Sequence, residues 1–325
     1  MPCFQCDETL PGVTAVTQNR LRNVGASVRQ RLLNLSKKKS EPFDLVLTRY
    51  ALERLLYRIG RSEWRSRFLL KGAMLYTLWF DASYRPTRDM VLLGFGPGQI
   101  AHLEGTFRAL CEVAVEDDGL TFLKENVRGS EIRGESEYRG VRMQVTAILS
   151  GAVIPLQIDV AFGDVVLPGP EEVRYPTILD LPAPEVLAYP RYTVVSEKFQ
   201  AMVMLGIANS RMKDFYDIRE LARRFEFDGL LLSRAIRATF EQRRTVLPAE
   251  IPLALTESFS HDRVKMTQWG AFIRKNRLME EKVSLQEVAV FLTGFLMPPV
   301  RAAQQGEAFE MIWTAPGPWE PRNPT

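Results

Sequence analysis

The acids that could do chemistry lie at two apolar, strand-like segments. Asp89 opens the run MVLLGF, and Asp159 lies inside the run PLQIDVAFG. A carboxylate at a strand end can bind Mg²⁺, which prefers oxygen ligands and keeps phosphates as partners, although Asp89 can equally be a surface acid paired with a nearby arginine. Asp159 alternates with Ile158 and Val160, and burying it unpaired would be costly. We therefore expect it to have a partner: a metal ion, an arginine or backbone donors.

Two lysines could contact phosphate. Lys71 precedes Gly72 between an apolar segment and a predicted helix. Glycine at a helix start lets backbone N–H groups approach an anion, and the helix dipole favours phosphate there. Lys198 lies near the start of another predicted helix. A Lys-Gly pair is also common for purely structural reasons, so whether it indicates a phosphate site depends on the residues that follow it.

A third acidic position lies in the segment SRMKDFYDI. Asp214 and Asp217 are three residues apart, which places both on one side of a helix. Taken alone, this is the pattern of a charged helix N-terminus whose acids suit the dipole.

The motifs of several other enzyme classes do not occur. The chain has no G-x-S-x-G elbow, no G-x-x-x-x-G-K-[ST] loop and only two histidines for a triad. Cys3 and Cys6 form a C-x-x-C, but one further cysteine and two histidines make a four-ligand zinc site hard to assemble. An exposed terminus is the favoured interpretation of that pair. The chemistry that needs only acids, a metal ion and a lysine is phosphoryl or nucleotidyl transfer.

Composition is that of a globular protein. The 325 residues are 46% hydrophobic and 25% charged. No apolar run reaches the roughly 18 residues that span a bilayer, and no secretory signal is recognisable, so we expect a cytoplasmic protein without membrane contact.

Lys and Arg outnumber Asp and Glu by 13 to 6 in residues 1–70, whereas acids lead by 17 to 11 in residues 71–196. This asymmetry suits a protein that holds a polyanion near a cation-loaded site, and solvated helical faces give the same counts.

The elements that must position these residues follow from periodicity. Helices are predicted at about 20–36 and 43–60, joined by the basic run Lys37–Lys39, which is typical of a solvated connection. Strands are predicted at MVLLGF, YRGVRMQVTAIL and VIPLQIDVAFG, and a helix at HLEGTFRALCEV. The pattern is helical from the Pro-rich connection to about residue 300, and we expect little regular structure after Arg301. Four parts result: a basic helical segment 1–65, a mixed core 66–192, a helical bundle 193–300 and a Pro/Gly-rich tail 301–325.

Four segments in this order resemble the AbiEii/AbiGii toxin family of nucleotidyltransferases. They are LLKGAMLYTLWF, RPTRDMVLLGFG, LQIDVAFGD and SEKFQAMVMLGIANSRMKDFYDI, and the similarity covers roughly residues 43–300. The resemblance implies an α+β fold, with a polymerase-β-like nucleotidyltransferase core of mixed sheet and helices plus a helical-bundle C-terminal domain. It also implies a bacterial toxin encoded beside an antitoxin, with relatives that add nucleotides to the tRNA 3′ end.

The resemblance also implies roles for single residues. Lys71 and Gly72 match the phosphate-side loop, and Lys198 matches the lysine expected to touch the triphosphate. Asp89 matches the first acid of the family's D-x-D, Asp159 the acid of the third strand and Asp214 that of the K-D-x-x-D segment. Asp89 and Asp159 would then hold Mg²⁺ or Mn²⁺. Arg85 and Thr87 would assist nucleotide binding at the turn.

The sequence departs from the family pattern at the second acid of D-x-D. Strand residues 89 and 91 share a face, and here the second position is Val91, which has no oxygen to offer an ion. Three explanations stay open: a natural degenerate copy, an inactivating substitution, or a site that uses Asp89 and Asp159 with water in the gap.

The leading hypothesis is therefore a toxin-type nucleotidyltransferase that transfers nucleotides from an NTP to an RNA acceptor. The tRNA 3′ end is the expected acceptor, a cognate antitoxin is the expected protein partner, and Val91 would impair the activity. The alternative is a non-catalytic protein, which binds nucleotide or RNA, or a degenerate toxin that still binds its antitoxin.

Overall fold

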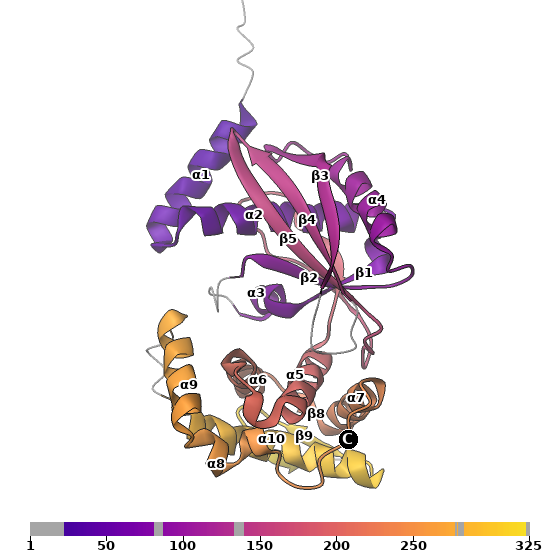
Figure 1. Cartoon of the computed structure of the whole chain (residues 1–325), viewed down its shortest axis with the longest axis vertical. Coiled ribbons are helices and arrows are strands. Elements are labelled where there is room, and N and C mark those ends of the chain that lie inside the picture. The colour runs from indigo at the N-terminus through magenta and orange to yellow at the C-terminus, as the bar shows by residue number, and fades with distance from the viewer. Residues whose placement is uncertain (1–22, 81–86, 133–139, 277, 279–282, 323–325) are drawn as a thin grey trace, which may run out of the picture.

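The computed structural model describes residues 23–80, 87–132, 140–276, 278 and 283–322. Arg85 and the Cys3–Cys6 pair lie outside these ranges. The chain forms two lobes, one built on a large sheet and one built of helices (Figure 1). No helix in the described ranges has both the length and the apolar character needed to cross a membrane.

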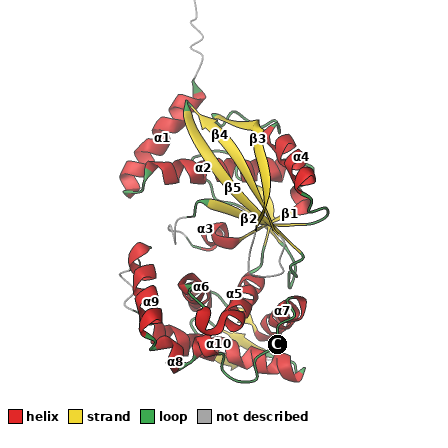
Figure 2. Ribbon diagram, in the orientation of Figure 1, coloured by secondary structure: helices red, strands yellow, loops and turns green. Residues whose placement is uncertain are grey.

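A seven-stranded mixed sheet forms the first lobe, in the order β3-β4-β5-β2-β1-β7-β6 (Figure 2). β2 runs parallel to β5 and β1 runs parallel to β7, while the other neighbours are antiparallel. The strands are β1 (Phe68–Lys71), β2 (Asp89–Gly94), β3 (Leu120–Ile132), β4 (Gly140–Leu149), β5 (Ala152–Phe162), β6 (Glu171–Arg174) and β7 (Glu185–Ala188). This mixed sheet confirms the α+β fold predicted from the sequence.

Helices cover one face of the sheet and leave the other partly open. α2 (Phe43–Arg61) lies against β5 and β7, α4 (Ile100–Cys111) lies against β3 and β4, and α1 (Val24–Lys39) packs on α2. Ile158 and Val160 are buried on the covered face, as their alternation with Asp159 predicted. Because Val91 and Asp159 are register partners in the β2–β5 pair, Asp89, Val91 and Asp159 share the open face. Val46, Tyr50 and Leu55 of α2 belong to the buried core, so the segment before residue 66 contributes to its packing.

The second lobe is a helical bundle, as predicted. α5 (Arg191–Leu205) packs on α6 (Met212–Arg224) and α7 (Gly229–Gln242), and the long α10 (Leu285–Gln305) lies across α6 and α7. The short α8 (Glu257–Ser260) leads into α9 (Arg263–Lys275) at one side (Figure 1). The remaining helices are α3 (Leu75–Trp79) and the 3-10 turns η1 (Arg65–Arg67), η2 (Gly72–Met74), η3 (Gly206–Ala208) and η4 (Leu253–Leu255).

The residues after Arg301 differ from the expectation of little regular structure. α10 continues to Gln305, and β9 (Met311–Trp313) pairs with β8 (Phe227–Asp228) and β10 (Trp319–Pro321). Trp313 is buried, and its Nε1 donates to the Ala222 carbonyl at 2.6 Å. The physical reason is aromatic burial: Trp313 and Trp319 pack on Phe295 with ring centroids 4.9 and 5.8 Å away.

A buried ion pair fixes α2 beneath the sheet. The Arg58 guanidinium donates to both carboxylate oxygens of Asp118 at 2.6 and 3.2 Å, and both side chains are buried. Asp118 also accepts from the Leu120 backbone N–H at 3.1 Å, so the pair ties the helix to the start of β3. Burying both charges is tolerable because the geometry is bidentate and the remaining acceptor is used.

Removing one partner of this pair should therefore destabilise the fold strongly. We expect Asp118→Ala to lower the free energy of unfolding by about 3–5 kcal/mol, because it leaves the buried Arg58 charge uncompensated. Chemical denaturation monitored by circular dichroism measures the change. Glu112→Ala, which breaks the exposed pair with Lys124, is the matched control and should change stability little. Equal losses in the two variants would contradict a special role for the buried pair.

Candidate functional site

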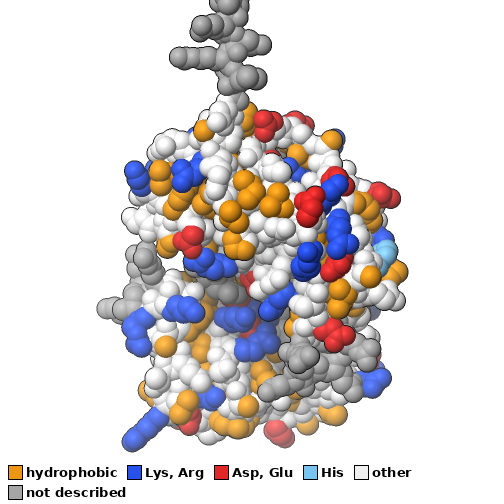
Figure 3. Space-filling view, turned by 45° about the horizontal axis from the view of Figure 1, so that its top comes forward, with side chains coloured by type: hydrophobic (Ala, Val, Ile, Leu, Met, Phe, Trp, Pro, Cys, Tyr) orange, Lys and Arg blue, Asp and Glu red, His pale blue; other side chains and the backbone are white. Residues whose placement is uncertain are grey.

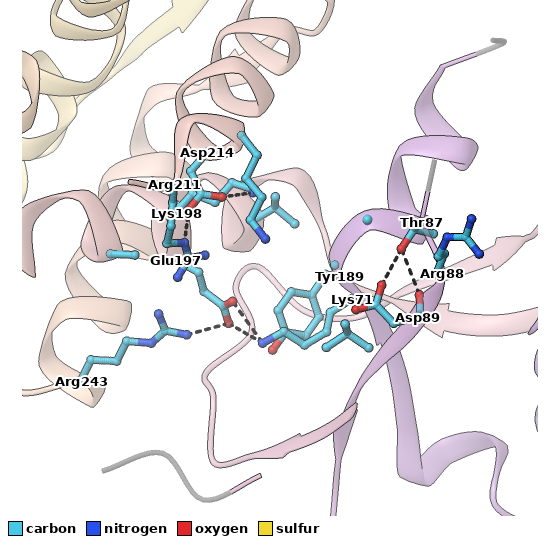
Figure 4. A pocket seen from close by; sticks show the side chains of 16 residues that line it. Lys71, Thr87, Arg88, Asp89, Tyr189, Glu197, Lys198, Arg211, Asp214 and Arg243 are labelled. Carbon is cyan, nitrogen blue, oxygen red and sulfur yellow. Dashed lines mark hydrogen bonds and ion pairs between the residues drawn. The ribbon is translucent and has the colours of Figure 1, made fainter. Parts of the chain in front are cut away.

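A cleft of about 480 Å³ lies between the two lobes (Figure 4). Its walls come from β1, β2 and the residues beside them in one lobe, and from α5, α6 and the ends of neighbouring segments in the other. The lining residues are Lys71, Gly72, Ala73, Thr87, Arg88, Asp89, Val91, Tyr189, Val194, Glu197, Lys198, Ala201, Arg211, Lys213, Asp214 and Arg243. Six site residues predicted from the sequence, Lys71, Gly72, Thr87, Asp89, Lys198 and Asp214, therefore meet in one place.

Asp89 stands where β2 begins and faces the cleft. The Thr87 hydroxyl donates to its Oδ1 at 2.6 Å, which orients the carboxylate. Among the described residues Asp89 has no ion-pair partner. The other carboxylates that line the cleft, Glu197 and Asp214, are each held by two cations. Asp89 is therefore the lining carboxylate that is most available to a ligand.

Lys71 is held by a network of charges at the floor of the cleft. Its Nζ donates to Asp164 at 2.6 Å and to Glu197 at 3.1 Å, and it lies 4.7 Å from the centroid of the Tyr189 ring. Arg243 joins the same two carboxylates, at 3.0 Å to Asp164 and 3.3 Å to Glu197. The network connects β1 and the end of β5 to α5 and to the end of α7, so it links the two lobes directly.

Gly72 is required by its own backbone and by its neighbour. Its φ is +75°, in the left-handed region that favours glycine, and a Cβ added there would come within 3.0 Å of Val91 Cγ2. The chain after Lys71 therefore lies directly over Val91. The helical segment that follows is short: the 3-10 turn η2 covers Gly72–Met74, and α3 after it has only five residues. A five-residue helix gives little macrodipole, so the helix-dipole argument for phosphate binding at Gly72 is weak in this fold.

Lys198 is positioned by two buried acids of α6. Its Nζ contacts Asp214 at 2.5 Å and Asp217 at 2.8 Å, and Arg211 Nε contacts the second Asp214 oxygen at 2.7 Å. The three-residue spacing of the acids, read from the sequence, places both on the helix face that meets α5. Asp214 is thus best described as a positioning residue, which fixes Lys198 and Arg211 at the cleft wall.

Asp159 lies on the open face beside Val91 but does not line the cleft. Arg142 on β4 donates to both of its oxygens, from Nε at 2.8 Å and from the terminal nitrogen at 2.9 Å. Of the three partners that the sequence left open, the structure gives it an arginine. The Arg142 pair occupies the carboxylate that the family resemblance assigned to a metal ion.

The described residues do not fit the Mg²⁺ or Mn²⁺ site that the family resemblance implies. The described ranges contain no group of three or more His, Cys, Asp or Glu side chains that could hold a metal ion. Asp89 offers its carboxylate, Val91 offers no oxygen, and Asp159 is engaged by Arg142 in a bidentate pair. The donor set for an ion at this position is therefore incomplete.

Sequence reasoning missed Asp164, Tyr189 and Arg243. Asp164 follows the strand residue Phe162 after a glycine with φ of +84°, and Arg243 follows the end of α7. Neither position belongs to a periodic pattern, and the partners of Lys71 lie 93 or more residues away in the chain. The weak signal available was the second acid in LQIDVAFGD.

Known proteins that are similar to this chain include one family and two solved structures. A model of the nucleotidyl transferase AbiEii toxin family, of type IV toxin–antitoxin systems, matches residues 54–304. The crystal structure of JHP933 from Helicobacter pylori aligns with 14% identity over 78% of this chain and 88% of that one, with a TM-score of 0.44. That of a candidate nucleotidyltransferase from the same organism aligns with 13% identity over 78% and 91%, with a TM-score of 0.43. No curated protein matches the sequence.

The cleft network predicts a pH dependence of stability. Burial raises the pKa of Asp164, but the charges of Lys71 and Arg243 outweigh it and hold the pKa below its ordinary value of 3.8. A carboxyl whose pKa is lowered on folding stabilises the fold above the unfolded value, and this contribution is lost as the pH falls through the folded pKa.

We therefore expect Asp164→Asn to lower the unfolding free energy at pH 7 by about 3 kcal/mol, since it leaves two cations under-compensated. The difference from the wild type should shrink as the pH falls below 3.8. Urea unfolding at a series of pH values measures it, with Glu241→Gln, in the exposed pair with Arg237, as control. A difference that stays constant with pH would show that the Asp164 charge is not the cause.

Proposed function

Because this chain belongs to the AbiEii family of nucleotidyltransferase toxins of type IV toxin–antitoxin systems, we propose that it transfers nucleotides from an NTP to an RNA acceptor. The acceptor we propose is the 3′ end of a tRNA, and the protein partner we propose is a cognate antitoxin. One observation carries the enzymatic part of the proposal: Lys71, Asp89 and Lys198, from three separate segments, line one cleft.

The charges of the cleft suit a triphosphate. Lys198 and Arg211 are fixed on one wall by Asp214, and Arg88 lies on the other. Fixed cations aimed at a phosphate chain can bind it without reorganising, which is the main requirement for phosphoryl-group transfer. Lys71 and Lys198 are each held by two carboxylates, whereas Arg211 pairs with Asp214 and its side chain is 47% exposed. We assign the main triphosphate contacts to Arg211 and to Lys198, which the same acid holds beside it on the cleft wall.

The reaction proposed is an attack by an RNA hydroxyl on the α-phosphate of the NTP. A phosphodiester bond forms, the bond between the α- and β-phosphates breaks, and pyrophosphate leaves. The hydroxyl proton passes to the Asp89 carboxylate, the lining acid without an ion-pair partner among the described residues. Thr87 orients that carboxylate through its hydrogen bond.

Val91 and the Arg142–Asp159 pair support a second candidate function. Val91 offers no oxygen ligand on the face that carries Asp89, and Arg142 already binds the carboxylate of Asp159 on that face. A chain with an incomplete donor set can retain nucleotide or antitoxin binding while transfer is slow or absent. Nucleotide binding without turnover is the behaviour that this alternative predicts.

A pair of substitutions at Val91 separates the two candidates. We expect Val91→Asp to raise the rate of labelled nucleotide transfer to total tRNA, because it supplies the second carboxylate whose absence leaves the donor set for a divalent ion incomplete. Val91→Asn has a similar shape without the charge and should not raise the rate. Asp89→Asn should lower transfer by about 100-fold or more, the usual range for loss of a proton acceptor. Absence of transfer by both the wild type and the Val91→Asp variant, with intact circular dichroism, would favour the binding protein.

Nucleotide binding can be tested without turnover. We expect Lys198→Met to weaken NTP binding by about 10-fold or more, because a charged hydrogen bond contributes roughly 1.5–3 kcal/mol. Isothermal titration calorimetry measures the affinity for each of the four NTPs. Lys124→Met alters an exposed lysine paired with Glu112, outside the cleft lining, and serves as control. Equal affinity in the wild type and the Lys198→Met variant would remove Lys198 from the proposed triphosphate site.

A further inference from the structure

A second and larger hollow, which we call the entry groove, adjoins the cleft. It has a volume of about 1100 Å³ and lies between the α1–α2 turn and α9. Figure 1 shows these two elements facing one another at the same side of the molecule. From α9 the groove is lined by Gln268, Ala271, Phe272 and Lys275, whose spacing of three and four residues places them on one helix face. The opposite wall is the stretch from Lys39 to Pro42.

Positive charge dominates the entry groove. Lys39, Arg88, Arg211, Lys213 and Lys275 line it, and Lys39 and Lys275 have no ion-pair partner in the part of the chain that the structure describes. Among the described residues the only lining carboxylate is Glu41, which Arg49 holds at 2.5 Å. Figure 3 shows Lys and Arg side chains gathered around the hollow between the lobes. Unpaired cations on facing walls attract a polyanion and release its counterions on binding.

The entry groove runs into the cleft. Arg88, Arg211 and Lys213 line both hollows. A linear polymer that lies between Lys39 and Lys275 would therefore reach the cleft at the wall that carries Arg211. Asp214 holds the Arg211 side chain at that wall. The end of such a molecule would enter the cleft that contains Asp89.

Among the described residues that line the entry groove, Phe272 is the aromatic side chain available for stacking. Phe272 is half-buried, and its ring is held against Trp269 and Tyr216 at centroid distances of 5.7 Å each. A fixed aromatic ring beside cations is the combination that binds unpaired nucleic-acid bases with little sequence preference.

We propose that the entry groove binds the single-stranded end of the RNA acceptor, with Lys39 and Lys275 on its phosphates and Phe272 against a base. This inference rests on the proposed function, because it assigns the acceptor path of the same cleft. An acidic protein is a different occupant. RNA is favoured because the groove opens into the cleft where an acceptor hydroxyl must arrive.

The test uses a double substitution outside the cleft. Lys39→Gln/Lys275→Gln removes two charges that line the entry groove but not the cleft. The probe is a fluorescein-labelled single-stranded RNA of about 12 nucleotides, titrated at several salt concentrations by fluorescence anisotropy. We expect binding about 10-fold weaker than the wild type at low salt, and a salt slope smaller by about 1.4, since each single-strand phosphate contact contributes about 0.7. Phe272→Leu should weaken binding without changing the slope.

The controls separate the groove from the cleft. Arg234→Gln neutralises an exposed arginine on α7, which does not line the groove, and should bind RNA as the wild type does. NTP affinity of the double variant should equal that of the wild type. If the wild type binds no NTP, the proposed function fails, and the RNA titration still decides the groove.

Three results would overturn the inference. They are unchanged RNA affinity in the double variant, an equal loss in the Arg234→Gln control, and a wild type that binds a polyglutamate peptide but not the RNA. The last result would assign the groove to an acidic protein partner.

Discussion

The placement of the two lobes relative to one another depends on charged side chains that meet at the floor of the cleft. Lys71 at the end of β1 and Arg243 beyond α7 share the carboxylates of Asp164 and Glu197, so each cation compensates both acids. Such a network is stable in a half-buried place only when every charge has a partner, because an unpaired buried charge is costly. The network therefore sets how far the wall with Lys198 stands from the wall with Asp89, and thereby the width available to a ligand.

The sequence predicted most of the helices and three strands of the large sheet, because their hydrophobic periods are strong. The α2 helix, the β2, β4 and β5 strands and the helical bundle all follow from apolar spacing. The β3 strand was missed because it lies at the sheet edge, where LKENVRGSEI carries charges on both faces, and because its pairing with β4 is irregular between Leu123 and Arg128. The β9 and β10 strands were missed because Pro and Gly dominate their surroundings, while the signal that mattered was the pair of tryptophans.

The candidate site was predictable only in part. Lys71, Asp89, Lys198 and Asp214 could be named because they belong to motifs, and the structure places them around one cleft. The partners of Lys71 could not be named, since Asp164 and Glu197 meet Lys71, and Arg243 meets the same two acids, through the tertiary fold alone. The pairing of Asp159 with Arg142 depends on the register of β4 against β5. A shift of one residue would turn the Arg142 side chain to the other face, and short-range sequence patterns do not specify register that closely.

The strand β9 has a consequence for the order in which the protein matures. Trp313 and Trp319 complete the aromatic interior of the bundle, and Trp313 also caps a carbonyl at the end of α6. During synthesis, α5 and α6 emerge long before these tryptophans do, so the wall that carries Lys198 and Arg211 lacks its support until the chain has been extended past Trp319. A nascent polypeptide that ends before Trp313 would leave the Phe295 ring without these two aromatic partners, so the bundle would fold completely only after the last described strand has been translated.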